Sequence, residues 1–186
     1  MNGSATEVFV YGTLTDPDTA AGVLDADAFE FRGRAVLDGL HRVDGRYPTL
    51  APGGSVEGRI LATSALDALD RYEGVADGLY VRVSVPVAAA DAFGSDGSQS
   101  VEVYVGDPDR LDAPAEWPGT ETETGTGTGT ETETEKPSFA ECVRRYVDDA
   151  VTVRRQTFDG FDGFDGDRGA ERTDAATEHD EWGIEE

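Results

Sequence analysis

The stretch Glu7–Leu14 reads EVFVYGTL and marks where the first strand of the chain ends. Val8–Tyr11 is a short apolar run that a glycine closes, which is typical of a buried strand. The run then breaks at Tyr11-Gly12-Thr13-Leu14 instead of continuing as a regular strand. We therefore ask what chemistry a strand that ends in Gly-Thr can serve.

A helix is predicted directly after this break, over Asp16–Asp25. Asp16 is a suitable N-cap residue and Pro17 occupies the first helical position, where its missing N–H costs nothing. The apolar positions of this segment fall at helical spacing: Ala20, Val23 and Leu24.

Four further segments have the pattern of strands, namely Glu30–Leu40, Ser55–Ala62, Leu79–Val87 and Val101–Val105. Gly58 marks a bulge or a close approach of two backbones within the second of them. An Asp-Gly turn followed by Tyr-Pro lies in Val43–Leu50. The Gly/Ser/Asp stretch between the last two strands is typical of a hairpin loop.

Two more helices are indicated by their apolar spacing. The first is Ser64–Tyr72, which Ser64 can cap, with Leu66, Leu69 and Tyr72 on one face. The second starts at Ser138 and is amphipathic, with Phe139, Val143, Tyr146 (beside Val147) and Ala150 facing the core. A short strand over Val151–Val153 follows it.

Acidic residues dominate the composition. The 186 residues include 39 Asp plus Glu against 15 Lys plus Arg, a formal net charge of −24. Binding to phosphate backbones or to anionic membranes requires clustered Lys and Arg, so neither nucleic acid nor a membrane is an expected partner. Residues 1–115 alone hold 19 acids and 8 bases. We therefore expect a halophilic, cytoplasmic protein whose self-repulsion is screened by salt.

Two segments are expected to lie outside the folded domain. Residues 119–135 read GTETETGTGTGTETETE and contain no side chain that can build a core, so they are expected to be a disordered insertion. Residues 159–186 begin with a repeated Phe-Asp-Gly and form an acidic tail. A single domain is thus expected from residues 1–118 together with 136–158.

The sequence lacks the motifs that several kinds of active site require. The chain has no Gly-x-Ser-x-Gly elbow, P-loop or Gly-x-Gly-x-x-Gly. Cys142 is the single cysteine and is expected to pack in the core, and His41 is expected at the surface. No metal site and no cofactor are expected, and no apolar run is long enough for a membrane span or a signal peptide.

Glu73 is the residue with the least usual position. It is expected on the last turn of the helix that ends at Tyr72, directly before Gly74, a plausible C′ residue. The helix dipole disfavours a negative charge at this end and raises the pKa of the carboxyl, which suits a general acid or base near neutral pH. The alternative is a solvated glutamate in a capping turn.

Five segments together resemble the gamma-glutamylcyclotransferase-like superfamily, in its order and approximate spacing. They are VFVYGTL, GRYPTL, VEGRIL, LDRYEG and YVRVSVPV, spread between about Val8 and Val105. The Tyr-Gly-Thr-Leu version of the first motif is similar to the branch that includes gamma-glutamylamine cyclotransferases.

The resemblance implies a fold and an activity. The fold is α+β, a small twisted, barrel-like mixed β-sheet with a few flanking helices. The activity is conversion of a gamma-glutamyl amine or peptide to 5-oxoproline with release of the amine, without metal or cofactor, by a monomer or homodimer. Glu73 takes the place of the general acid/base, and Tyr11, Gly12, Thr13 and Leu14 match the substrate loop, whose N–H groups would hold the glutamyl end. Tyr47, Tyr80 and Arg82 lie in matching segments without an assigned role.

Three alternatives stay open from the sequence. The same pocket can serve an amide hydrolase, or a non-catalytic module that binds a small ligand. The Phe-Asp-Gly repeat of the tail can instead gather cations, although it has no EF-hand pattern.

Overall fold

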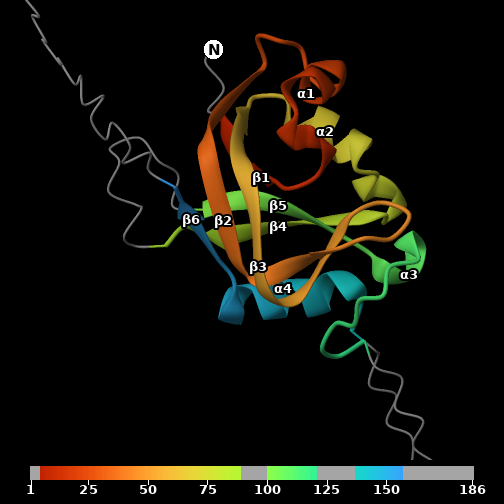
Figure 1. Ribbon diagram of the computed structural model, residues 1–186. Coiled ribbons are helices and arrows are strands. Elements are labelled where there is room, and N and C mark those ends of the chain that lie inside the picture. The colour runs from red at the N-terminus through yellow and green to blue at the C-terminus, as the bar shows by residue number, and fades with distance from the viewer. Residues whose placement is uncertain (1–4, 89–99, 121–136, 157–186) are drawn as a thin grey trace, which may run out of the picture.

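A computed structural model describes residues 5–88, 100–120 and 137–156. Within these residues six strands form one sheet in the order β4-β5-β1-β3-β2-β6 (Figure 1). The strands are β1 Thr6–Val10, β2 Phe29–Val43, β3 Thr49–Thr63, β4 Tyr80–Pro86, β5 Ser100–Gly106 and β6 Thr152–Arg155. The helices are α1 Pro17–Val23, α2 Leu66–Tyr72, α3 Pro108–Leu111 and α4 Phe139–Ala150, with 3₁₀ turns η1 Thr13–Thr15 and η2 Val75–Asp77.

The sheet is mixed and curls toward a barrel. β1 pairs antiparallel with β3 and parallel with β5, whereas the long β2–β3 pair is antiparallel with register shifts between Phe31 and Gly33 and between Asp38 and Leu40. Such irregularities bend a strand and increase its twist. The two edge strands approach each other, since Val87 bridges Val153 and the amide of Ala88 donates to the carbonyl of Val153 at 2.8 Å. The expected α+β, barrel-like fold is confirmed.

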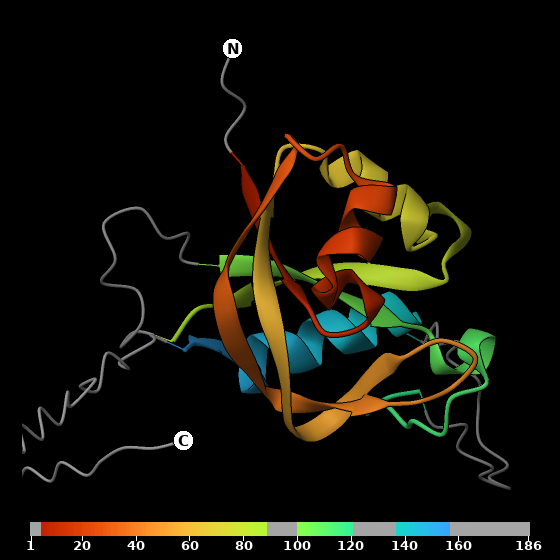
Figure 2. The same cartoon turned by 45° about the horizontal axis from the view of Figure 1, so that its top comes forward.

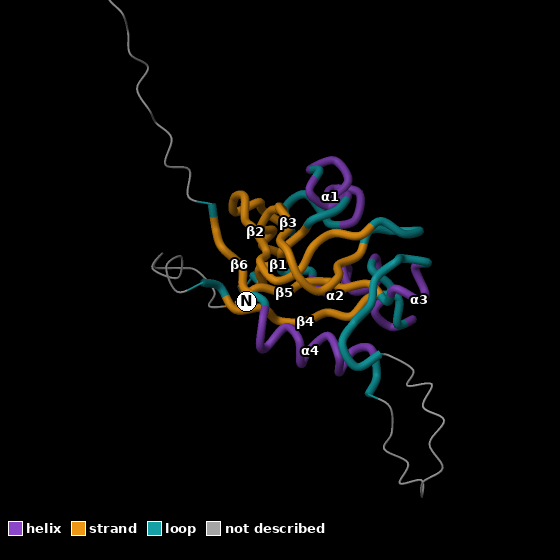
Figure 3. The backbone as a smooth tube through the Cα atoms, turned by 60° about the horizontal axis from the view of Figure 1, so that its bottom comes forward, coloured by secondary structure: helices purple, strands orange, loops and turns teal. Residues whose placement is uncertain are grey.

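Helices cover both ends of the curled sheet. α1 and α2 lie together at one end (Figure 2), and α4 crosses the other end beside β4 (Figure 3). β1 runs between the two halves of the core and is buried on both faces. Phe9 belongs to the core cluster under α4, while Val8 and Val10 belong to the cluster under α1 and α2. This placement explains why the last three residues of β1, Val8–Val10, are all apolar and buried.

The predicted starts of α1 and α4 are confirmed. The Asp16 side chain accepts from the amide of Thr19 at 2.9 Å, and Pro17 opens α1. Ser138 and Glu141 form a reciprocal capping box at the start of α4. These local patterns were enough to place both helices.

The predicted apolar face of α4 is correct except at its last position. The buried residues of the helix are Cys142, Val143 and Val147. Phe139 and Tyr146 pack edge-on against the buried Trp117, with ring centroids 5.8 and 5.6 Å away. Ala150 was expected to face the core and is exposed, because the chain leaves the helix there to start β6.

The predictions for α2 need two corrections. Ser64 does not cap the helix: the N-cap residue is Ala65, whose amide donates to Thr63 Oγ1 at 3.0 Å. Thr63 takes this part because it is buried and its hydroxyl also donates to the carbonyl of Ala28. Tyr72, expected on the packed face, is 48% exposed, and of the helix only Leu69 is fully buried.

Parts of the predicted domain division lie outside the described residues. Of the segment 119–135, Gly119 and Thr120 belong to a turn in which the amide of Thr120 donates to the carbonyl of Trp117 at 3.1 Å. The remainder of that segment, the predicted hairpin loop between β4 and β5, and the tail 159–186 are not described.

Candidate active site

The end of β1 opens into a cavity of about 390 Å³. The cavity lies among the β1–η1 turn, the α2–η2 turn, the β2–β3 connection, and strands β4 and β5. Its lining residues are Phe9, Val10, Tyr11, Gly12, Thr13, Leu14, Tyr47, Pro48, Tyr72, Glu73, Leu79, Tyr80 and Tyr104. The structure therefore brings all five residues that the sequence singled out, Glu73 and Tyr11–Leu14, to one cavity.

Hydrogen bonds from the residues that follow it close the turn after β1, and the Thr13 hydroxyl lies 3.5 Å from the Tyr72 hydroxyl. Thr15 donates to the carbonyl of Gly12 from both its amide and its hydroxyl, at 3.1 and 2.7 Å, and the amide of Asp16 donates to the carbonyl of Thr13 at 3.1 Å. No described residue accepts from the amides of Gly12, Thr13 or Leu14. Three successive residues that line the cavity therefore have N–H donors without a partner among the described residues, and successive N–H donors suit an anionic or developing negative oxygen.

The two ends of this turn are fixed differently. The Leu14 side chain is buried beside α1 and supplies an apolar wall. The Tyr11 hydroxyl donates to the carbonyl of Tyr104 on β5 at 2.9 Å. The turn is thus attached to the core at one end and to the neighbouring strand at the other.

Glu73 ends α2 as predicted. Its amide donates to the carbonyl of Leu69 at 2.9 Å, and Gly74 follows in the left-handed conformation with φ 66°. The left-handed geometry favours glycine, and it turns the chain so that Glu73 stands at the cavity.

The Glu73 carboxyl has an altered acidity. Removal from water raises its pKa from 4.5 to about 7, because burial disfavours the charged form. The sequence predicted the direction of this change and attributed it to the helix dipole, whereas burial is the cause. No described residue forms a hydrogen bond or an ion pair with this carboxylate. Glu73 can therefore both accept and release a proton near neutral pH.

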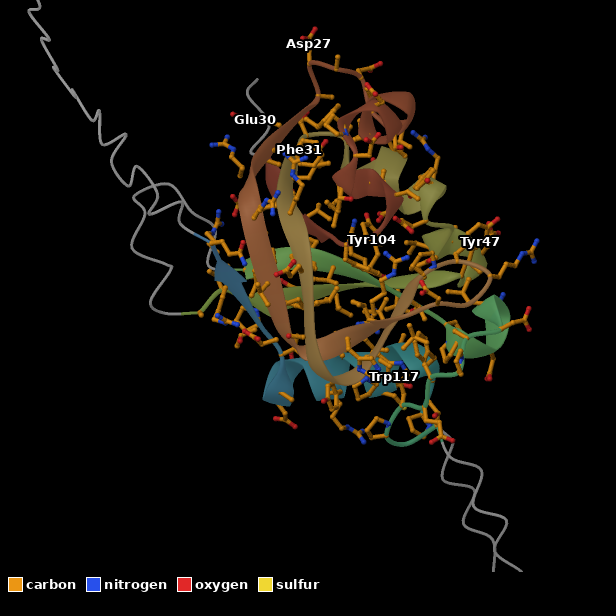
Figure 4. The ribbon with its side chains drawn as sticks, viewed as in Figure 1. Asp27, Glu30, Phe31, Tyr47, Tyr104 and Trp117 are labelled. Carbon is orange, nitrogen blue, oxygen red and sulfur yellow. The ribbon has the colours of Figure 1, made fainter. Side chains whose placement is uncertain are left out.

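Tyrosines form much of the remaining lining. Five of the six tyrosines of the chain, all except Tyr146, line the cavity. Tyr80 donates to the carbonyl of Pro48 at 2.7 Å, which joins β4 to the β2–β3 connection. Tyr47 and Tyr72 are the two large apolar side chains exposed among the described residues, and both stand at this cavity. Figure 4 shows Tyr47 and Tyr104 contributed from different elements.

Sequence reasoning missed part of this lining. Tyr72 was assigned to the packed face of its helix, and Tyr104 was treated only as a strand residue. The adjacency of Tyr72 to Glu73 was the available signal for the first, and no local signal marked the second. Arg82, by contrast, lies outside the lining and pairs with Asp70 at 2.7 Å and with Glu102 at 3.5 Å.

The other reactive residues lie elsewhere. His41 is exposed, and its Nδ1 is 3.0 Å from the carbonyl of Gly53, while Cys142 is buried in α4. Among the described residues no group of three or more His, Cys, Asp or Glu side chains could hold a metal ion. No helix in the described part of the chain is long and apolar enough to cross a bilayer.

A family model described as "Gamma-glutamyl cyclotransferase, AIG2-like" matches residues 8–121, more than half of the chain. The chain belongs to this family. The match includes the whole lining of the cavity and ends before α4. The gamma-glutamyl cyclotransferase, AIG2-like assignment thus covers every residue that the candidate site uses.

Several proteins of known structure are similar to this chain. An AIG2-like protein from Mus musculus is 26% identical, with 61% of this chain and 86% of that chain covered and a TM-score of 0.44. A protein of Arabidopsis thaliana is 32% identical over 63% of this chain and 80% of that chain, with a TM-score of 0.43. A gamma-glutamyl cyclotransferase is 20% identical over 55% and 67% of the two chains, with a TM-score of 0.45. No curated protein sequence matches the chain.

Proposed function

We propose that the protein converts a gamma-glutamyl amine or peptide to 5-oxoproline and releases the amine. One observation carries this proposal: Glu73, with a pKa of about 7, shares a cavity with the unpartnered amides of Gly12, Thr13 and Leu14. A proton-transfer group and a set of N–H donors are the two components that an internal acyl transfer requires.

The reaction exchanges one C–N bond for another within a single substrate. Glu73, ionised, takes a proton from the α-ammonium group, and the free amine attacks the γ-carbonyl carbon. The carbonyl oxygen gains negative charge, which the N–H groups of the turn stabilise. When the intermediate collapses, Glu73 returns its proton to the departing nitrogen, and the second proton that the attacking nitrogen loses also passes to this amine, which leaves as an ammonium ion. A C–N bond has formed, another has broken, and no further reactant is consumed.

The cavity also accounts for how a strongly acidic protein holds an anionic substrate. A gamma-glutamyl group carries an α-carboxylate, and among the described residues no Lys or Arg lines the cavity. Neutral amides can accept this carboxylate without a cation. Because both reacting groups belong to one molecule, holding the folded-back conformer supplies much of the rate enhancement.

The test is a panel of gamma-glutamyl amines and dipeptides incubated with the full chain in molar KCl, with 5-oxoproline followed by mass spectrometry. We expect product from the parent and at least about a hundredfold less from Glu73→Gln. Glu116→Gln is the matched control, because Glu116 is exposed and lies outside the cavity.

Other outcomes identify the alternatives. Free glutamate in place of 5-oxoproline would show an amide hydrolase. Ligand binding that survives Glu73→Gln, with no turnover by the folded parent, would show a binding module. Equal 5-oxoproline formation by Glu73→Gln and the parent would exclude Glu73 as the acid/base.

A further inference from the structure

Tyr104 of β5 is engaged at both its backbone and its side chain. Its carbonyl accepts a hydrogen bond from the Tyr11 hydroxyl at 2.9 Å, and its own hydroxyl donates to Asp70 Oδ1 at 2.7 Å. Tyr11 begins the turn with the free amides, and Asp70 lies on α2 one turn before Glu73. One residue therefore contacts both halves of the candidate site.

Asp70 is held from a second direction as well. Arg82 Nη1 donates to Asp70 Oδ2 at 2.7 Å, and Arg82 Nε is 3.5 Å from Glu102 Oε2. Each carboxylate oxygen of Asp70 thus has its own donor, one from β4 and one from β5. Hydrogen bonds to a charged partner are about twice as strong as neutral ones, so this pair fixes α2 against the sheet.

The other contacts of α2 are the packing of half-buried Leu66 and Ala68 against the core and the Tyr72 hydroxyl, which lies 3.5 Å from Thr13 Oγ1. The helix is seven residues long, no side chain caps its start, and Leu69 is its one fully buried residue. A helix of this length is not stable by itself and depends on its tertiary contacts. The polar contacts of Asp70 therefore matter for where the end of the helix, and with it Glu73, stands.

We infer that Tyr104 is a positioning residue that sets the spacing between the Tyr11–Leu14 turn and Glu73, acting through Tyr11 on one side and Asp70 on the other. Its catalytic consequence rests on the proposed function, whereas its geometric consequence does not. Tyr104 also lines the cavity, so its ring occupies the space between the parts it connects.

The hydrogen bond from Tyr104 to Asp70 and the one from Tyr11 to Tyr104 can be removed separately. Tyr104→Phe removes the hydroxyl bound to Asp70 and keeps the carbonyl bound to Tyr11. We expect kcat to fall about ten- to a hundredfold, with little change in KM, because small displacements of a catalytic group have effects of this size. Tyr11→Phe frees the turn instead, and we expect it to raise KM.

A second readout follows Glu73 without any substrate. The other ionisable groups at the cavity are the phenols of Tyr11, Tyr47, Tyr72, Tyr80 and Tyr104. Burial raises the pKa values of Tyr11, Tyr80 and Tyr104 further above that of an ordinary phenol. A titration of the Glu73 carboxyl near pH 7 can therefore be followed while these three groups stay neutral.

The experiment is a ¹³C NMR titration of the full chain labelled at glutamate carboxyls, with the Glu73 signal assigned by its loss in Glu73→Gln. In the parent we expect a midpoint of about 7. In Tyr104→Phe we expect a lower midpoint, because a released α2 lets water reach Glu73. Tyr146→Phe is the matched control: its hydroxyl donates to the Gly39 carbonyl at 3.2 Å, away from the cavity.

Variants of Asp70 test the same link from its other end and serve if Tyr104→Phe does not fold. Asp70→Ala removes the contacts with both Tyr104 and Arg82, so it should lower kcat and the Glu73 midpoint at least as much as Tyr104→Phe does. Asp70→Asn should keep part of kcat because its amide oxygen can still accept from Tyr104. The double variant Tyr104→Phe with Asp70→Ala should be no slower than Asp70→Ala alone, since the two share one interaction.

The outcomes separate the inference from the proposed function. An unchanged Glu73 midpoint and an unchanged kcat in Tyr104→Phe would overturn the inference while the parent remains a cyclotransferase. A lowered midpoint in Tyr104→Phe, with no 5-oxoproline from the parent, would support the inference and reject the proposed function.

Discussion

Gly58 on β3 lies directly against the end of β1, with no room for a side chain between the strands. A Cβ atom at Gly58 would stand 2.6 Å from Phe9 Cζ and closer still to the carbonyl oxygen of Val10. This contact occurs at the point where β1 stops and the Tyr11–Leu14 turn begins. The sequence indicated a close approach at Gly58, and this contact supports the end of β1 from which the Tyr11–Leu14 turn begins.

Gly58→Ala should therefore destabilise the fold, by about 1–3 kcal/mol, because backbone has to move to admit the methyl group. Chemical denaturation at fixed KCl measures the change. Gly22→Ala is the control: Gly22 lies in α1, a Cβ there meets nothing within 4 Å, and the replacement should stabilise by about 0.5–1 kcal/mol. Equal stabilities of Gly58→Ala and the parent would contradict the close contact.

The acidity of Glu73 predicts a pH dependence of activity. As the base, Glu73 must be ionised before the substrate is attacked, so kcat/KM should fall as pH drops through about 7. Well below that pH the loss should be about tenfold for each unit. Initial rates between pH 5 and 8.5 at constant KCl measure this fall in kcat/KM. Circular dichroism at each pH is the control for folding. If the fall in kcat/KM were centred near pH 4.5, Glu73 would be solvated in the working enzyme.

The ionisation of Glu73 should also affect the stability of the fold. Stability should fall as pH rises, whereas activity should fall as pH drops. A carboxyl whose pKa is raised in the folded state favours folding while it is protonated, and this contribution is lost as pH rises from 4.5 through about 7. The change corresponds to about 3 kcal/mol at most. Glu73→Gln, which stays neutral, should therefore be more stable than the parent at pH 8.5 and nearly equal to it at pH 4.

Chemical denaturation of the parent and of Glu73→Gln at pH 4 and at pH 8.5 tests this stability difference. Glu116→Gln, at an exposed position, should show no such difference between them. If Glu73→Gln were less stable than the parent at pH 8.5, the charged carboxylate would have a partner that stabilises it.

The elements predicted correctly are those that depend on neighbouring residues. Asp16 caps α1 through Thr19 and Ser138 caps α4 through Glu141, contacts between residues only three positions apart, so the starts of both helices are visible in the local sequence. The turn after β1 could likewise be located, because an apolar strand ends there at a glycine. The start of α2 was misplaced because the amide of Ala65, the N-cap residue, donates to the Thr63 hydroxyl, which in turn donates to the carbonyl of Ala28, 35 residues earlier.

The candidate site was predictable in part for the same reason. Glu73 and the Tyr11–Leu14 turn carry short motifs, and the resemblance of the whole pattern implied their roles, whereas their meeting at one cavity comes from the structure. The link through Tyr104 joins residues 93 and 34 positions apart, to Tyr11 and Asp70 respectively. No pattern in β5 distinguishes Tyr104 from an ordinary strand tyrosine, so its place between the two halves requires the structure.

Gly12→Ala tests whether the amides of the turn hold the substrate. A Cβ at Gly12 meets nothing within 4 Å, so the folded protein has room for it and its unfolding midpoint should change little. A bound gamma-glutamyl group would lie where the methyl group projects if it accepts hydrogen bonds from this backbone. We then expect kcat/KM to fall about ten- to a hundredfold, mainly through KM. Steady-state kinetics measures this beside Gly22→Ala, the same replacement in α1 outside the cavity. Unchanged KM and unchanged kcat in a folded Gly12→Ala would place the substrate elsewhere in the cavity, away from the amides of the turn.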